Sequence, residues 1–130
     1  MSASPSDAPL DPVRLIESEW QELRRQAAGL PYPWAPAYRS LVEAAYAEPR
    51  LRALYPYTSH WTLRFSTTTR PRLTAVGPCL ITHDEGAFGV GRGFITSDLG
   101  VFATAREAVA AALTHLPVGP GPVTLGAEPQ

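Results

Sequence analysis

The fold is decided in the stretch from residue 54 to residue 69, which reads LYPYTSHWTLRFSTTT. From Trp61 to Ser66, large apolar residues alternate with polar ones. Side chains alternate between the two faces of a strand, so a strand is predicted over 61–68, with one face in the core and the other free for water or a ligand. The residues before Trp61, rich in Tyr, Thr, Ser and His, are expected to form a loop at the mouth of this strand.

Three further strands are predicted downstream, over 73–82, 87–95 and 100–103. Gly77-Pro78 interrupts or bends the first of these, which predicts either an edge strand or a bulged strand. Asp84-Glu85-Gly86 and Ser97-Asp98-Leu99-Gly100 predict tight turns between the strands. The alternate glycines of Gly89-Val90-Gly91-Arg92-Gly93 indicate a bulge, or a place where another backbone or a ligand approaches closely.

Helices are predicted on both sides of these strands. Asp11 caps a helix that begins at Pro12 and ends at Gly29. Its apolar residues recur at spacings of three and four, which predicts one buried stripe: Val13, Ile16, Trp20, Leu23 and Ala27. A second helix is predicted over 36–47, a short helical turn from Pro49, and a last helix from the capping box at Thr104 to His115.

The order α-α-β-β-β-β-α with tight turns between strands predicts an α+β fold, a four-stranded antiparallel meander with helices packed on one face. The length of 130 residues suits one domain, expected over 11–117. A disordered lead over 1–10 and a flexible tail over 118–130, rich in Pro and Gly, are expected at the ends.

Composition excludes several classes of function. The net charge of -1 provides no field that would attract nucleic acid or an anionic membrane, and no apolar run is long enough to cross a bilayer. All 11 basic residues are arginines, so no side-chain amine is available for Schiff-base chemistry. The single Cys79 cannot form an intrachain disulfide, and the first residues lack a signal peptide, so a cytoplasmic location is expected.

The usual catalytic and cofactor patterns are missing. His60, His83 and His115 lie too far apart in sequence for a metal-ligand spacing, and no metal or other cofactor is predicted. The glycine run is not followed closely by a helix, as a dinucleotide fingerprint requires. No G-x-S-x-G elbow occurs, and Cys79 in its apolar surroundings is interpreted as core.

The segment at the start of the first predicted strand is therefore the candidate ligand-binding wall. Aromatic rings with polar tips, together with a few oriented polar groups, suit a concave pocket. In the alternative interpretation, the tyrosines close over the core and Arg64 pairs with a glutamate of a neighbouring helix. The predicted substrate-binding residues are Tyr55, Tyr57, Thr58, His60, Trp61 and Arg64.

The segment from Leu51 to Ser66, followed by Pro78 and a closing helix that ends in Leu116-Pro117, resembles an actinobacterial family of natural-product-biosynthesis proteins of unknown function. The resemblance covers residues 20–121, and Leu-Tyr-Pro-aromatic-Thr-Ser-His at 54–60 is its most specific part. Size and organisation are also similar to the lysinoalanine synthases of cinnamycin- and duramycin-type lanthipeptide clusters. This second resemblance implies a homodimer that joins a lysine amine to a dehydroalanine of a precursor peptide.

The resemblance implies a cofactor-free tailoring protein that binds and positions a ribosomal precursor peptide or a small natural-product intermediate. Tyr57, His60 and Arg64 are assigned here as orienting groups, with Tyr55 and Trp61 as walls. No catalytic residue is assigned. Two alternatives stay open, a non-catalytic accessory protein that binds a peptide or a partner, and an enzyme that acts on a small metabolite in a hydrophobic pocket.

Overall fold

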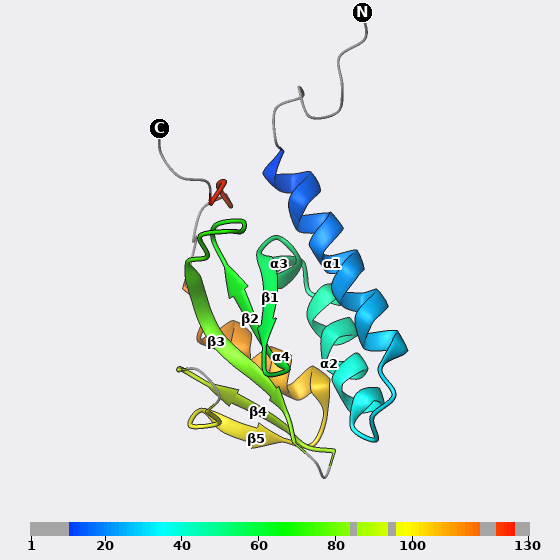
Figure 1. The fold of residues 1–130 in the computed structure, drawn as a ribbon. Coiled ribbons are helices and arrows are strands. Elements are labelled where there is room, and N and C mark those ends of the chain that lie inside the picture. Colours follow the sequence, from blue (N-terminus) through cyan, green and yellow to red (C-terminus); the bar gives the residue numbers. More distant parts are fainter. Residues whose placement is uncertain (1–10, 84–85, 94–95, 118–121, 127–130) are drawn as a thin grey trace, which may run out of the picture.

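The computed structural model describes residues 11–83, 86–93, 96–117 and 122–126, and Figure 1 shows the fold. Within these residues, helices and an antiparallel sheet form an α+β domain, as the sequence predicts, but the sheet has five strands where four were expected. The elements in chain order are α1 (Pro12–Gly29), α2 (Ala35–Ala47), α3 (Pro49–Arg52), β1 (Tyr55–Ser59), β2 (Thr62–Ser66), β3 (Ala75–Thr82), β4 (Phe88–Gly91), β5 (Gly100–Phe102) and α4 (Ala105–Thr114).

Helix α1 begins as predicted, because the Asp11 side chain accepts a hydrogen bond from the Val13 amide at 3.0 Å. The predicted stripe is buried except at its first residue, since Val13 is 71% exposed. This residue lies in the first helical turn, ahead of the part of α1 that reaches the sheet. Within the described part of the chain, no helix is long and apolar enough to cross a membrane.

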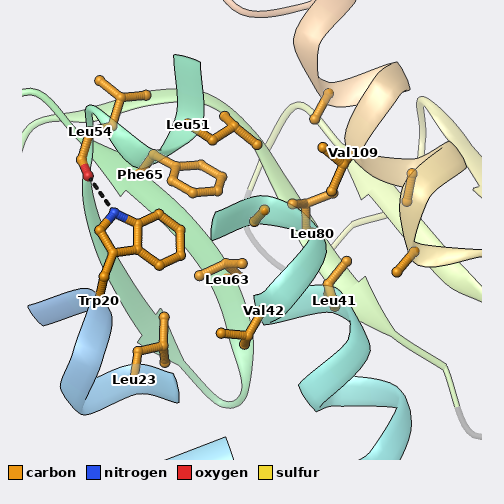
Figure 2. Close-up of a cluster of buried hydrophobic side chains, with 14 of the residues drawn as sticks. Trp20, Leu23, Leu41, Val42, Leu51, Leu54, Leu63, Phe65, Leu80 and Val109 are labelled. Carbon is orange, nitrogen blue, oxygen red and sulfur yellow. Dashed lines mark hydrogen bonds between the residues drawn. The ribbon is translucent and has the colours of Figure 1, made fainter. Parts of the chain in front are cut away.

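Trp20 anchors the core between the helices and the sheet (Figure 2). Its ring is fully buried, and its indole Nε1 donates to the Leu54 and Arg52 carbonyl oxygens, each at 3.1 Å. These two bonds attach α1 to the end of α3, directly before the sheet begins. Leu51 and Leu54 are buried, as the short helical turn from Pro49 predicts.

The sheet has the strand order β1-β2-β3-β4-β5, and every neighbouring pair is antiparallel. The strand that the sequence reasoning missed is β1, in the segment expected to be a loop. It pairs with β2 from Tyr55↔Ser66 to Ser59↔Thr62, and the connecting turn consists of His60 and Trp61. Both turn residues have left-handed backbone angles, with φ of 53° and 62°. Two-residue hairpin turns usually carry Asn or Gly at such positions, so this turn had no recognisable sequence signal.

Of the two alternatives predicted for this strand, the bulge is confirmed, because the β2–β3 register shifts between Leu63 and Phe65. The edge position is wrong, because β3 is the central strand of the sheet. Gly77 has a φ of 72°, and a Cβ atom there would lie 2.8 Å from Cδ1 of Leu116. Only glycine adopts this left-handed backbone angle without strain and also leaves room for the Leu116 side chain. The sequence signal at Gly77-Pro78 therefore had a direct structural cause.

Strands β4 and β5 are shorter than predicted, and part of the expected 87–95 strand lies outside the described residues. So do the predicted lead over 1–10, two residues of the turn at Asp84-Glu85-Gly86, and 118–121 and 127–130 of the predicted tail. Helix α4 follows with the expected capping box, in which the Thr104 hydroxyl accepts from the Glu107 amide at 3.1 Å. The helix contacts β3, β4 and β5 and so covers the second half of the sheet (Figure 1).

Residues 122–126 differ from the predicted flexible tail, because they pack against the loop between β2 and β3. Thr124 forms a parallel bridge with Thr68 and exchanges backbone hydrogen bonds with Thr67 and Thr69. Val123 is buried in the core. The domain therefore includes these residues as well as 11–117. The prediction rested on the Pro and Gly content. Composition does not reveal a short apolar segment whose backbone forms hydrogen bonds with another part of the fold.

Candidate functional site

The six predicted wall residues do not form a single surface. In β1, Tyr57 lies opposite Arg64, whereas Thr58 lies opposite Leu63, and cross-strand partners share a face. Leu63 is fully buried, so its row faces the hydrophobic core, whereas Tyr57 and Arg64 lie on the opposite, outer face of the hairpin, where both are half buried. His60 and Trp61 stand in the turn at the end of the hairpin. The alternation that we predicted therefore begins at Thr62, and Trp61 does not continue the row of Leu63 and Phe65.

Tyr55 is largely buried rather than part of an open wall. Burial raises the pKa of its phenol, and the Glu19 carboxylate of α1 adds to the rise. This matches the alternative interpretation for this tyrosine. His60 is exposed, and its Nδ1 lies 3.3 Å from the Ser59 hydroxyl.

Trp61 belongs to an aromatic patch of four residues, Tyr32, Trp34, Tyr38 and Trp61. The ring centroid of Trp61 lies 5.4 Å from that of Trp34 and 5.6 Å from that of Tyr38. Tyr32 stacks on Trp34 with centroids 5.0 Å apart and planes within 9°. Tyr32 is 47% exposed and Trp61 39% exposed, while Tyr38 is fully buried beneath them. The two exposed rings, Tyr32 and Trp61, thus pack on the two more buried rings, Trp34 and Tyr38.

The patch joins segments that are distant in sequence. The α1–α2 link supplies Tyr32 and Trp34, helix α2 supplies Tyr38, and the β1–β2 turn supplies Trp61. Pro31 and Pro33 hold the link out of helical geometry, whereas Pro36 lies in the first turn of α2. No local sequence signal indicated that the aromatic residues of the link and of the hairpin meet.

The Tyr38 hydroxyl is a buried polar group beneath this patch. Within the described residues it has no hydrogen-bond partner, although the Thr58 side chain is close enough to lower its pKa slightly. Burial dominates and raises the pKa of Tyr38 to about 12. The phenol therefore stays neutral at physiological pH.

A hollow of about 540 Å³ lies beside Tyr32, between the end of α1 and the start of α2. Its wall includes Ala27, Pro31, Tyr32, Arg39 and Ser40. Two other hollows, of about 490 Å³ and 310 Å³, lie between α2 and α4 and beside the first turn of α1. None of these three is lined by a predicted wall residue. Only the first is connected to the predicted site, through the Tyr32 stack on Trp34.

On the outer face of the hairpin, Arg64 and Tyr57 lie across from each other. The Arg64 Nη2 donates to the Gly77 carbonyl oxygen at 3.1 Å, and so binds the bulge of β3. Its Nε is buried without a hydrogen-bond partner among the described residues. The glutamate partner considered in the sequence interpretation is not present among the described ion pairs.

The loop between β4 and β5 brings together a His–Ser pair that sequence reasoning missed. His83 Nε2 lies 3.0 Å from Ser97 Oγ, over Gly89, where a Cβ atom would lie 2.0 Å from that hydroxyl oxygen. The close approach of another backbone, one of the alternatives predicted at the glycine run, is confirmed at Gly91, where a Cβ atom would lie 2.1 Å from the Thr96 carbonyl oxygen of the β4–β5 loop. The contact resembles a base–nucleophile pair, but no described carboxylate bonds the other ring nitrogen of His83, as a triad would require.

Asp98 secures the same loop instead of orienting His83. Its carboxylate accepts from the Arg92 amide and Nε, each at 2.9 Å, and from the Thr96 hydroxyl at 3.0 Å. These bonds hold the pKa of Asp98 at about 2. Cys79, buried as predicted, lies with its Sγ 3.5 Å from the Thr96 carbonyl oxygen. In the described part of the chain, no group of three or more His, Cys, Asp or Glu residues could hold a metal ion.

Comparison with known proteins adds one assignment. Neither a curated protein nor a solved structure matches the chain. A family model does match, over residues 14–127, and this range includes both the aromatic patch and the segment 122–126 that packs beside β2. The chain therefore belongs to the family described as "Family of unknown function (DUF6193)".

Proposed function

We propose that this protein binds a ribosomally made precursor peptide at the aromatic patch of Tyr32, Trp34, Tyr38 and Trp61, and holds it in position for tailoring. The observation that carries the proposal is the pair of open rings, Tyr32 and Trp61, supported from below by covered aromatic neighbours. Large aromatics with supported positions are typical anchors at binding interfaces.

Preorganisation is the physical reason for assigning binding to this patch. Tyr32 stacks on Trp34, and Trp61 packs edge-on against Tyr38, so both open rings are already held by neighbours before a ligand arrives. A ligand then loses little of its binding free energy to ordering these side chains. The neighbouring hollow of about 540 Å³ offers room for one side chain of a bound peptide.

The tailoring step that we propose is addition of a lysine amine of the peptide to a dehydroalanine of the same peptide, which gives lysinoalanine. The nitrogen lone pair attacks the alkene carbon, and a proton moves from the nitrogen to the adjacent carbon, so no oxidant or cofactor is consumed. Holding two reacting groups in contact can lower the barrier by about 7–11 kcal/mol in well-oriented cases. A protein that only shapes its substrate is therefore sufficient for this reaction. The basis for choosing this substrate is the resemblance of residues 51–66 to natural-product-biosynthesis proteins.

Binding is tested by titrating the protein with a dehydrated and cyclised precursor peptide of the cinnamycin type, followed by calorimetry and tryptophan fluorescence. Trp61→Ala is expected to weaken binding about tenfold or more, as loss of a central aromatic anchor does. Val101→Ala is the matched control, because Val101 is 57% exposed and lies on β5, at the opposite edge of the sheet. Equal affinity of the Trp61→Ala variant and the wild-type protein would exclude the patch.

Tailoring is tested separately with the same peptide. Mass spectrometry after acid hydrolysis is expected to detect lysinoalanine at a rate above that of the peptide alone, and Trp61→Ala is expected to lower this rate. Binding without any increase in crosslink formation would favour the accessory-protein alternative, in which the same patch delivers the peptide to another enzyme. Absence of both binding and crosslinking would refute the proposal.

A further inference from the structure

A positively charged group on the outer face of the hairpin lacks a counter-charge. Arg64 is half buried, and its Nε has no hydrogen-bond partner among the described residues. Its Nη2 donates to the Gly77 carbonyl oxygen at 3.1 Å, whereas Nη1 has no described partner and is not among the buried unpaired atoms. The outer end of the guanidinium is therefore open to solvent, and its inner end is not.

No described carboxylate compensates this charge. Arg14, Arg24, Arg25 and Arg92 form ion pairs with described carboxylates, and Arg64 forms none with them. A guanidinium that is partly removed from water loses hydration, and it recovers this loss when an anion accepts its hydrogen bonds. Supporting the bulge at Gly77 requires a single donor and no positive charge, so that role alone does not explain an arginine here.

The neighbouring side chains are neutral and polar. Tyr57 lies directly opposite Arg64 on β1, is half buried, and its hydroxyl bonds to no residue that the structure describes. Thr62 and Ser66 lie on the same strand face, two residues to either side of Arg64, and both are buried. The Ser66 hydroxyl is already hydrogen-bonded to Thr68 and Thr74, whereas the Tyr57 hydroxyl remains available as a donor beside Arg64.

We propose that Arg64 and Tyr57 form a binding site for one carboxylate, with the guanidinium supplying charge-assisted hydrogen bonds and the phenol supplying a further donor. A single guanidinium among neutral hydroxyls matches a monoanion, whereas phosphate sites usually gather more positive charge or backbone amides. The carboxylate can come from a peptide C-terminus or from a small organic acid.

This site is separate from the aromatic patch. Trp61 packs on Tyr38, whose hydroxyl approaches Thr58 in the core-facing row of the hairpin. Arg64 and Tyr57 belong to the outward-facing row, so the hairpin lies between the two surfaces. The carboxylate site therefore goes beyond the proposed function and does not depend on it.

The test observes the Arg64 Nε–H directly by ¹⁵N nuclear magnetic resonance. All 11 basic residues are arginines, and the Arg64→Lys variant identifies the Arg64 signal by its disappearance. The wild-type protein is titrated with acetate, with N-acetylglycine as a peptide C-terminus, with the uncharged N-acetylglycinamide, and with inorganic phosphate. Both carboxylates are expected to produce a saturable shift of the Arg64 signal, and N-acetylglycinamide none. Tighter binding of N-acetylglycine than of acetate assigns the site to a peptide terminus, and the reverse order to a small acid.

Variants check that the two side chains act together. Tyr57→Phe is expected to weaken N-acetylglycine binding roughly two- to tenfold, as loss of one hydrogen bond does. Arg14→Gln is the control, because Arg14 is an exposed arginine on α1, and it should leave the Arg64 titration unchanged. The proposal fails if no carboxylate gives a saturable shift, if the uncharged amide gives the same shift, or if phosphate binds more tightly than either carboxylate.

Discussion

At the scale of single residues, Tyr38 illustrates how an aromatic residue can be selected for its ring rather than for its hydroxyl. The ring supports Trp34 and Trp61, with centroids 6.0 Å and 5.6 Å away. The hydroxyl is buried without a partner among the described residues. A buried and unpaired hydroxyl costs free energy, whereas the ring contributes packing and aromatic contacts.

Replacing Tyr38 by Phe is therefore expected to leave the free energy of unfolding within about 1 kcal/mol of the wild-type value at neutral pH, or to raise it. The pKa of Tyr38 rises from 10.0 to about 12 on folding. The stability that the neutral phenol contributes is therefore fully present below pH 10 and is lost as the pH rises to about 12. The Phe variant lacks this alkaline loss. Urea unfolding at about pH 8 and about pH 11 measures both effects. A destabilisation above about 2 kcal/mol at neutral pH would mean that the hydroxyl is hydrogen-bonded, for example to a buried water.

At the scale of elements, the glycines of β4 allow the β4–β5 loop to lie on the sheet. A Cβ atom at Gly91 would stand 2.1 Å from the Thr96 carbonyl oxygen, and one at Gly89 would overlap the Ser97 side chain. The loop is held in this position by the three hydrogen bonds to the Asp98 carboxylate. Strand and loop therefore depend on each other for their conformation.

Gly91→Ala is expected to destabilise the protein by about 1–3 kcal/mol, because the new methyl group forces the Thr96 backbone away from β4. Gly29→Ala is the matched control, since a Cβ atom there meets nothing within 4 Å, and its stability should be equal or slightly higher. Urea denaturation of both variants gives the comparison. Equal stability of Gly91→Ala and wild type would show that the loop does not rest on β4.

At the scale of the whole molecule, the two ends of the described chain are joined to the sheet in different ways. Helix α1 is tied to the start of the sheet through the bonds of Trp20 to the Arg52 and Leu54 carbonyls. Residues 122–126 are tied to the β2–β3 loop through Thr124 and Gly126, whose amide donates to the Thr69 hydroxyl at 3.1 Å. Val123 adds apolar burial to the core.

Truncation after Pro117 is expected to lower the free energy of unfolding by about 2 kcal/mol or more, through loss of a buried valine and several backbone hydrogen bonds. Truncation after Gly126 keeps all of these contacts and serves as the control. Thermal and urea unfolding of the two truncated proteins measure the difference. If both unfold at the same denaturant concentration, the segment 122–126 contributes nothing to stability.

The elements with strong local signals were predictable from sequence. Asp11-Pro12 and the Thr104–Glu107 box gave the two capped helix starts, because capping depends on residues within one turn. Gly77-Pro78 located the bulge for a similar reason, because glycine permits left-handed backbone angles and proline fixes its own φ. The α+β class and the antiparallel meander followed from the order of these local signals.

The hairpin and the surfaces built on it were decided by tertiary contacts. His60 and Trp61 adopt left-handed angles in the β1–β2 turn without the residues that normally prefer them. The packing of Trp61 on Trp34 and Tyr38 offsets the cost of these angles, and those partners lie more than twenty positions away in the chain. Sequence determined which segments can be helix, strand or turn, since those preferences are local. Only the folded chain decided that the aromatic residues meet and that Arg64 stands opposite Tyr57, because contact between distant residues depends on register and packing.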